Sequence, residues 1–159
     1  MVPDVNTGEL FTVKLRGNAD RIDRLAGFTR IIDYKTGQVK NQEVKLEEIN
    51  LLREHDSPAK LLQLLTYAWM FRKMNPIKDS GPDELVSGIV SLRFASKYLI
   101  NATIGKDEKL SESRLSEFEA VLTEVLEEIF NPQIPFSQTE NLEICSYCAF
   151  QKICNRVIN

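Results

Sequence analysis

Two neighbouring stretches decide the fold of this chain: GNADRIDR at residues 17–24 and IIDYKTG at residues 31–37. β-favouring and apolar side chains over residues 20–24 and 28–34, with Ala26-Gly27 between them, predict two antiparallel strands joined by a short turn. Asp33 and Lys35 are two residues apart, so they share one face of the second strand. The antiparallel pairing is expected to bring Asp20 beside them.

This grouping of two carboxylates and one lysine has a chemical interpretation. Paired carboxylates are oxygen ligands for a hard cation such as Mg²⁺. A lysine beside that cation can orient a water molecule or stabilise charge that develops on a phosphate. Metal-dependent cleavage of a phosphodiester is therefore one hypothesis. Taken alone, however, D-x-K at a strand end is also the pattern of a surface salt bridge.

Strands and helices alternate along the rest of the sequence, which predicts an α/β or α+β fold with a mixed sheet. Ser57 and Pro58 predict a helix start, as the N-cap and the first helical residue. The further predictions are strands at 10–16, 85–94 and 97–103, a loop with some helical character at 38–56, and helices at 57–74 and 111–130. We divide the chain into a core at 1–140 and a C-terminal tail at 141–159.

The composition is that of a globular protein. The length of 159 residues corresponds to one domain. A net charge of -3 argues against strong non-specific affinity for nucleic acid, although an acidic domain can carry a local basic groove. Neither a long apolar run nor a signal-peptide pattern occurs, so the cytoplasm is the expected location.

Three motifs together resemble those of the PD-(D/E)xK nuclease superfamily: G-x-x-D-R-I-D from residue 17, I-I-D-Y-K-T-G from residue 31, and Q-L-L-T-Y at residues 63–67. The resemblance covers about residues 9–70 and is strongest to the RecB-type and AddB-type nuclease domains of DNA repair and recombination. It implies a restriction-endonuclease-like core, in which helices flank a mixed central sheet. It also implies hydrolysis of DNA with Mg²⁺ or Mn²⁺.

The resemblance also implies a role for each strand residue. Asp20 and Asp33 would be the acidic metal ligands, and Tyr34 would offer its backbone carbonyl to the same metal. Lys35 would position the attacking water and stabilise the transition state. Asp23, in contrast, is expected to be a structural partner of Arg21 or of the arginine at position 24.

Gln63 and Tyr67 are four residues apart and therefore lie on one face of the predicted helix. They match the Q-x-x-x-Y motif that borders the active site and faces DNA in this branch of the superfamily. Without the resemblance, the favoured interpretation of the same two residues is the polar fringe of a helix packed on a core.

Three cysteines, Cys145, Cys148 and Cys154, form the pattern C-x₂-C-x₅-C in the tail. Thiolates at this spacing ligate soft metals or an iron–sulfur cluster, and reduced thiols on a short terminal helix are the alternative. The triplet resembles the C-terminal iron–sulfur staple of AddB-like nucleases. That resemblance implies a 4Fe–4S cluster in a longer parent protein, completed by a fourth cysteine that these residues lack.

In the family, a helix precedes the first strand, and here the first predicted strand begins at about residue 10. We therefore expect the N-terminal helix to be missing and the chain to be the C-terminal part of a longer protein with a helicase-like portion. The leading hypothesis is a metal-dependent DNA nuclease domain. The alternatives are a non-catalytic DNA-binding or scaffold domain with a nuclease fold, and a zinc-binding interaction module on the tail.

Overall fold

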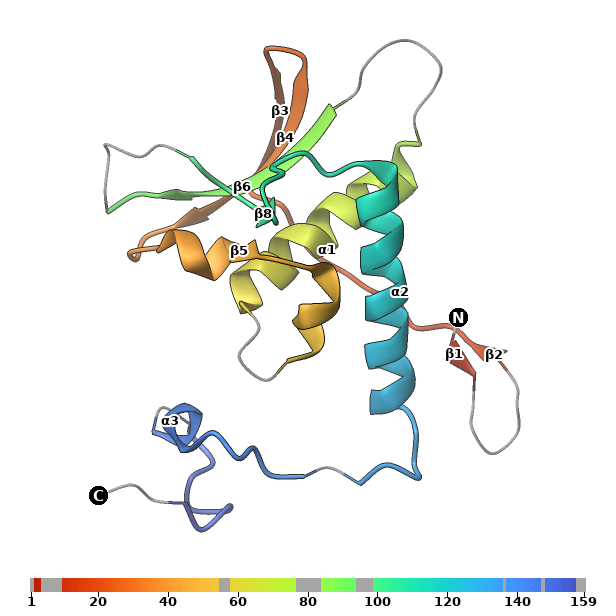
Figure 1. The fold of residues 1–159 in the computed structure, drawn as a ribbon, viewed down its shortest axis with the longest axis vertical. Helices are drawn as coiled ribbons and strands as arrows, with labels where there is room; N and C mark the ends of the chain where they lie inside the picture. Colours follow the sequence, from red (N-terminus) through yellow and green to blue (C-terminus); the bar gives the residue numbers. More distant parts are fainter. Residues whose placement is uncertain are drawn as a thin grey trace.

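A mixed sheet of four strands forms the centre of the protein in the computed structural model (Figure 1). The structure describes residues 2–3, 10–54, 58–76, 84–93, 99–135, 137–146 and 148–156. The strand order is β3-β4-β6-β7, in which β4 and β6 are parallel and the two outer pairs are antiparallel. The strands are β3 (Arg21–Leu25), β4 (Phe28–Lys35), β6 (Glu84–Ser91) and β7 (Ile100–Asn101).

The predicted hairpin of β3 and β4 is confirmed, and its turn explains its register. Ala26 and Gly27 have φ angles of 52° and 85°, the left-handed values that a two-residue hairpin turn requires. Leu25 and Phe28 are therefore the first cross-strand pair, and the ladder runs on to Arg21 opposite Ile32. Asp20 thus lies one residue before the first residue of β3.

Helix α1 (Ala59–Met74) connects the parallel strands β4 and β6 and covers one face of the sheet. A parallel pair needs such a crossover, and an apolar helix is its usual form. Its fully buried side chains meet alternate residues of β4 and β6 in one core. That core includes Ile31, Leu61, Leu64, Leu65, Leu85 and Ile89.

Helix α2 (Glu112–Ile129) packs against α1 and against the short 3₁₀ helix η2 (Ile49–Arg53) (Figure 1). Its predicted start is confirmed, because the Ser111 hydroxyl accepts a hydrogen bond from the Arg114 backbone N–H. α1 packs directly on β4 and β6, and α2 packs on α1, so the two helices lie on the same side of the sheet.

The other elements are short. They are β1 (Val2–Pro3), which pairs with β2 (Leu10–Phe11), the 3₁₀ helix η1 (Asn41–Val44), β5 (Lys45–Leu46), which pairs with β8 (Thr103–Ile104), and α3 (Leu142–Cys145). Residues 38–56, predicted as a loop with helical character, contain η1, β5 and η2. Figure 1 shows the segment that carries α3 lying apart from the sheet.

The predicted strand at 10–16 is wrong beyond Phe11, because residues 12–19 have no regular secondary structure. Val13 and Leu15 are half-buried and their neighbours are exposed, so the alternation of burial is the one expected of a strand. No neighbouring strand pairs with these residues in the part of the chain that the structure describes. Alternation of burial alone does not make a strand without a hydrogen-bonding partner.

Three predicted boundaries also change. Pro58 is the N-cap of α1 and not its first residue, since its extended backbone places its carbonyl to accept from the Leu62 N–H at 3.1 Å. Strand β6 ends at Ser91, and the predicted edge strand divides into β7 and β8 around the buried Ala102. Ser57 and Phe94, and residues 97–98, lie outside the described residues.

Before β3, the residues that the structure describes contain two short strands and no helix. The observed architecture is a mixed sheet with helices, as the sequence predicts, and it is consistent with a restriction-endonuclease-like fold. None of the described helices has both the length and the apolar composition needed to span a membrane.

Replacement of Phe118 tests how α2 is held on the core. Phe118 is fully buried, whereas Ile129 near the end of the same helix is 52% exposed. We expect Phe118→Ala to lower the free energy of unfolding by about 3–5 kcal/mol through the cavity it leaves. Ile129→Ala should change it by less than about 0.5 kcal/mol. Urea denaturation of both variants measures the difference, and equal losses would contradict this packing.

Candidate active site

The predicted site residues Asp33 and Lys35 lie at the end of β4, on the face that α1 covers. Asp33 is only 4% exposed, and the Lys35 side chain is 32% exposed. The Lys35 Nζ lies 2.8 Å from the Asp33 Oδ2, so the two form an ion pair at the edge of the core. The prediction that they share one face is confirmed. Their backbone belongs to the central parallel pair of strands, which fixes their position.

Gln63 on α1 joins these two side chains. Its Oε1 accepts a hydrogen bond from the Lys35 Nζ at 3.2 Å, and its Nε2 donates to the Asp33 Oδ1 at 3.2 Å. The Nε2 also donates to the Tyr67 hydroxyl at 2.9 Å. An ammonium only donates and a carboxylate only accepts, so the neighbours determine which end of the amide is oxygen. The structure therefore brings Gln63 and Tyr67 into one network with Asp33 and Lys35.

Asp20 directly precedes β3, the antiparallel neighbour of β4, and its side chain reaches the end of β4 where Asp33 and Lys35 lie. Its Oδ2 accepts a hydrogen bond of 2.8 Å from the backbone N–H of Tyr34. The carboxylate thus lies at the peptide unit that joins Asp33 to Tyr34. Tyr34 is two residues beyond Ile32, where the β3–β4 ladder ends, so the ladder does not use the Tyr34 carbonyl.

Asp33 is a buried carboxylate with few partners among the described residues. Its Oδ2 is buried, and its partner among these residues is the Lys35 ammonium at 2.8 Å. A buried carboxylate is costly unless its charge is compensated, and of the residues that the structure describes, one ammonium and one amide do so for Asp33. Within the described part of the chain, no three His, Cys, Asp or Glu side chains converge on one point. Asp20, Asp33 and the Tyr34 carbonyl are oxygen donors of the kind that Mg²⁺ binds with additional waters, and their joint role as metal ligands stays a prediction.

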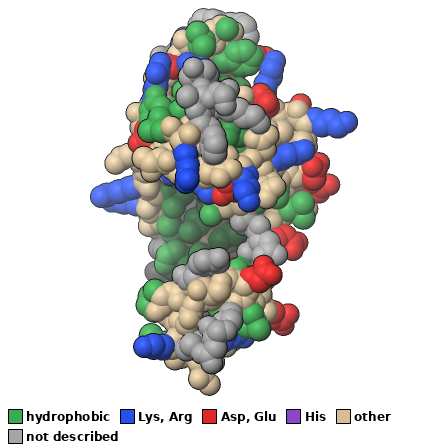
Figure 2. Space-filling view, turned by 90° about the vertical axis from the view of Figure 1, so that its left-hand side faces the viewer, with side chains coloured by type: hydrophobic (Ala, Val, Ile, Leu, Met, Phe, Trp, Pro, Cys, Tyr) green, Lys and Arg blue, Asp and Glu red, His purple; other side chains and the backbone are tan. Residues whose placement is uncertain are grey.

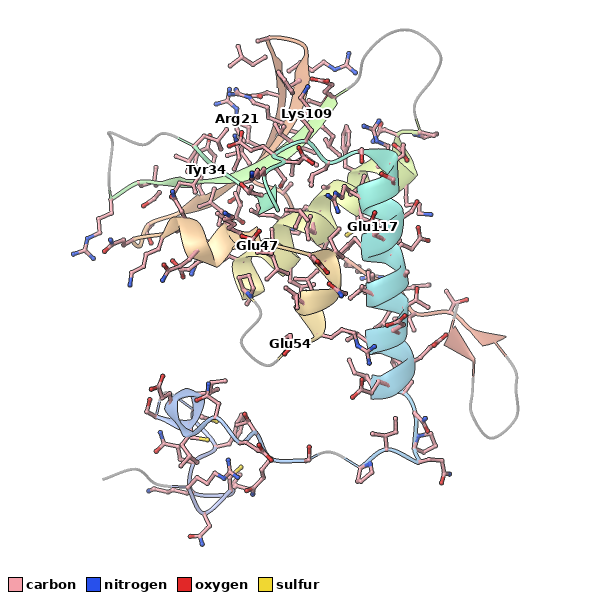
Figure 3. The ribbon with its side chains drawn as sticks, viewed as in Figure 1. Arg21, Tyr34, Glu47, Glu54, Lys109 and Glu117 are labelled. Atoms are coloured by element: carbon pink, nitrogen blue, oxygen red, sulfur yellow. The ribbon has the colours of Figure 1, made fainter. Side chains whose placement is uncertain are left out.

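A second ionic network lies on the opposite face of the hairpin. Asp23 accepts two hydrogen bonds from Arg30, from Nε at 2.7 Å and from Nη2 at 2.8 Å. Arg21 also pairs with Asp23, with Nη2 at 2.6 Å from Oδ2, which confirms the expected structural partnership. The Arg21 Nη1 lies 3.5 Å from the Tyr34 hydroxyl, and Figure 3 shows both residues on the sheet.

Sequence reasoning missed Arg30, although a signal for it exists. A two-residue turn at 26–27 puts residues 23 and 30 directly opposite each other, and they are an aspartate and an arginine. Hydrogen bonding to Arg30 is the largest cause that lowers the pKa of Asp23 below its ordinary value. Asp23 is thus fully engaged in structure, in contrast to Asp33.

The three predicted cysteine ligands do not meet in the described part of the tail. Cys145 is buried, Cys148 and Cys154 are half-buried, and all three are free thiols. The Phe150 N–H donates to the Cys148 Sγ at 3.4 Å, and the Arg156 Nη1 lies 4.0 Å from the Cys145 Sγ. Among the described residues they are not part of any group of three side chains that could hold a metal, and their role as cluster ligands stays a prediction.

Basic side chains are spread over the part of the surface where the sheet lies. Figure 2 shows lysine and arginine side chains across the upper part of one face, and acidic side chains mostly along one edge. A chain of net charge -3 therefore still presents positive charge locally.

The Asp23 network predicts a pH dependence of stability. Because the folded-state pKa of Asp23 is lowered, its ion pairs stabilise the protein above the ordinary carboxyl pKa and are lost as the pH falls through the folded-state pKa. The loss in unfolding free energy on Asp23→Asn should therefore be full near neutrality and shrink towards zero in acid. Urea denaturation from about pH 2 to pH 6 measures it.

Arg30→Gln removes the same hydrogen bonds from the other side and should show the same trend with pH. If the loss for either variant were constant over this range, the assignment of the pH effect to this pair would be wrong.

The sequence model of the PD-(D/E)XK nuclease superfamily matches residues 4–155, which include the β3–β4 hairpin, the Gln63–Tyr67 helix and the cysteine tail. No curated protein and no solved structure matches the chain. Because the family match spans nearly the whole sequence, the chain belongs to the PD-(D/E)XK nuclease superfamily.

Proposed function

We propose that this domain is a metal-dependent nuclease that hydrolyses phosphodiester bonds in DNA. The observation that carries the proposal is the network of Asp33, Lys35, Gln63 and Tyr67 at the end of β4. Membership of a superfamily of hydrolytic nucleases supports the general activity. Mg²⁺ or Mn²⁺ would be held by the carboxylates of Asp20 and Asp33 and by the Tyr34 carbonyl.

Each residue of the network has a distinct task in this proposal. When bound, the divalent cation supplies charge neutralisation and a more acidic water. Lys35, at the solvent-facing side of the ion pair, orients the attacking water and donates to the phosphate oxygen that gains charge. Gln63 holds the Lys35 ammonium and the Asp33 carboxylate at a fixed separation, and Tyr67 fixes the Gln63 amide. Such preorganisation lowers the reorganisation needed during the reaction.

The finer proposal is a domain of a RecB-type or AddB-type helicase–nuclease that acts in DNA repair or recombination in the cytoplasm. The spacing of its motifs supports this branch, and the local basic surface supports DNA as the partner. In a longer protein, Cys145, Cys148 and Cys154 would ligate a 4Fe–4S cluster after rearranging and gaining a fourth ligand. No step of the hydrolysis depends on that cluster.

Calorimetric titration of Mn²⁺ tests the metal ligands. We expect Asp33→Asn to weaken binding at least about tenfold, because it removes a buried anionic oxygen ligand. Asp23→Asn is the matched control on the opposite face of the same hairpin, and its affinity should equal that of the wild type. Equal losses in the two variants would show that the measured binding is not at this site.

Cleavage of labelled DNA tests the reaction. Lys35→Met should lower kcat by about 100-fold or more, since it removes a cation aimed at the developing charge. Mn²⁺ affinity should not fall in this variant, because Lys35 is not a metal ligand in the proposal. The control is Lys109→Met, which changes an exposed lysine that pairs with Glu84.

A wild-type domain that binds DNA but shows no metal-dependent cleavage would instead favour the non-catalytic DNA-binding or scaffold function. Fluorescence anisotropy with the same DNA measures that binding.

A further inference from the structure

Gly17 lies against the ring of Tyr67, three residues before Asp20. A Cβ built on Gly17 would be 2.6 Å from the Tyr67 Cε1 and 3.1 Å from its Cδ1. Carbon atoms that are not bonded to each other do not approach so closely, since their optimal separation is about 3.5–4.0 Å. The backbone at this point therefore touches the ring only because the residue is glycine.

Neither backbone conformation nor burial explains this glycine. The glycines with left-handed φ angles among the described residues are Gly27 and Gly105, so Gly17 has a backbone that alanine also adopts. Gly17 is itself exposed, so it is not a core residue that needs to be small. What remains is the contact with Tyr67.

The two residues in this contact are connected to different parts of the candidate site: Gly17 to the segment that carries Asp20, and Tyr67 to the helix that carries Gln63. From Gly17 the chain runs to Asp20, whose carboxylate accepts from the Tyr34 N–H. From Tyr67, the hydroxyl accepts from Gln63, which bonds both side chains of the ion pair on β4. Ala19 and Tyr67 both pack against the core, which limits how far either can yield.

We propose that Gly17 is a positioning residue of the nuclease site. Its bare backbone on the Tyr67 ring sets the distance between the segment that carries Asp20 and the helix that carries Gln63. An added methyl group pushes these two halves apart, and the carboxylates and the lysine then no longer act together. This inference rests on the proposed nuclease function and deepens it.

The test compares Gly17→Ala with Gly37→Ala. Gly37 lies two residues after Lys35, and a Cβ built there meets nothing within 4 Å. We expect Gly17→Ala to lower kcat about tenfold with little change in KM for DNA, the effect of misplacing one or two hydrogen bonds. Its Mn²⁺ affinity should also fall. Gly37→Ala should match the wild type in both measurements.

A double-mutant cycle shows whether the effect passes through the ring. Tyr67→Ala removes the atoms that the new methyl group would meet. In that background, Gly17→Ala should therefore lower kcat and Mn²⁺ affinity no further. The proposal would be overturned if Gly17→Ala lowered kcat equally with Tyr67 and with Ala at position 67, or if Gly37→Ala lowered kcat as much as Gly17→Ala does.

The outcomes separate this inference from the function on which it rests. Loss of Mn²⁺ affinity in Gly17→Ala, with no cleavage even by the wild type, would refute the nuclease proposal and leave the positioning role intact. Cleavage that Gly17→Ala does not alter would refute the positioning role alone. A wild type that neither binds Mn²⁺ nor cleaves DNA would refute both.

Discussion

The side-chain amide of Gln63 is the interaction on which the candidate site depends. It places an acceptor against the Lys35 ammonium and a donor against the Asp33 carboxylate. These two charges lie where the sheet meets the core, and a buried charge without hydrogen bonds costs several kcal/mol. One neutral amide thus supplies a hydrogen bond to each member of the ion pair.

The position of that amide depends in turn on how α1 is held on the sheet. The hydroxyl of Ser87, buried in β6, lies 3.2 Å from the Ile31 carbonyl and 3.3 Å from the Leu64 carbonyl. Its single proton is thus shared between β4 and α1. Leu64 follows Gln63 directly, so this buried contact fixes the helix turn that carries the amide. Ser87 contributes to the site without touching it.

The hairpin and both long helices could be predicted, because local residues determine them. The turn at 26–27, the apolar run of α1 and the Ser111 cap of α2 each need little tertiary information. Residues 12–19 and the division of the edge strand could not be predicted, because they depend on which backbone lies alongside. Pattern reasoning grouped Gln63 and Tyr67 with the site only through a resemblance. Their bridging geometry follows from the crossover that brings α1 over the end of β4.

Asp23 and Asp33 show why the hairpin carries two different kinds of carboxylate. Asp23 sits on the open face and receives two aligned hydrogen bonds from Arg30 and an ion pair from Arg21. Asp33 sits on the covered face, where Gln63 donates one hydrogen bond to Oδ1 and the Lys35 ammonium lies 2.8 Å from Oδ2. A satisfied carboxylate gains little from a cation, because binding would first have to displace its arginines. A buried carboxylate with only one ammonium and one amide as partners gains both charge and coordination from a cation. We therefore expect Asp23 to be structural and Asp33 to be the carboxylate available to a metal, because arginines of the hairpin occupy the first, whereas one lysine and one glutamine contact the second.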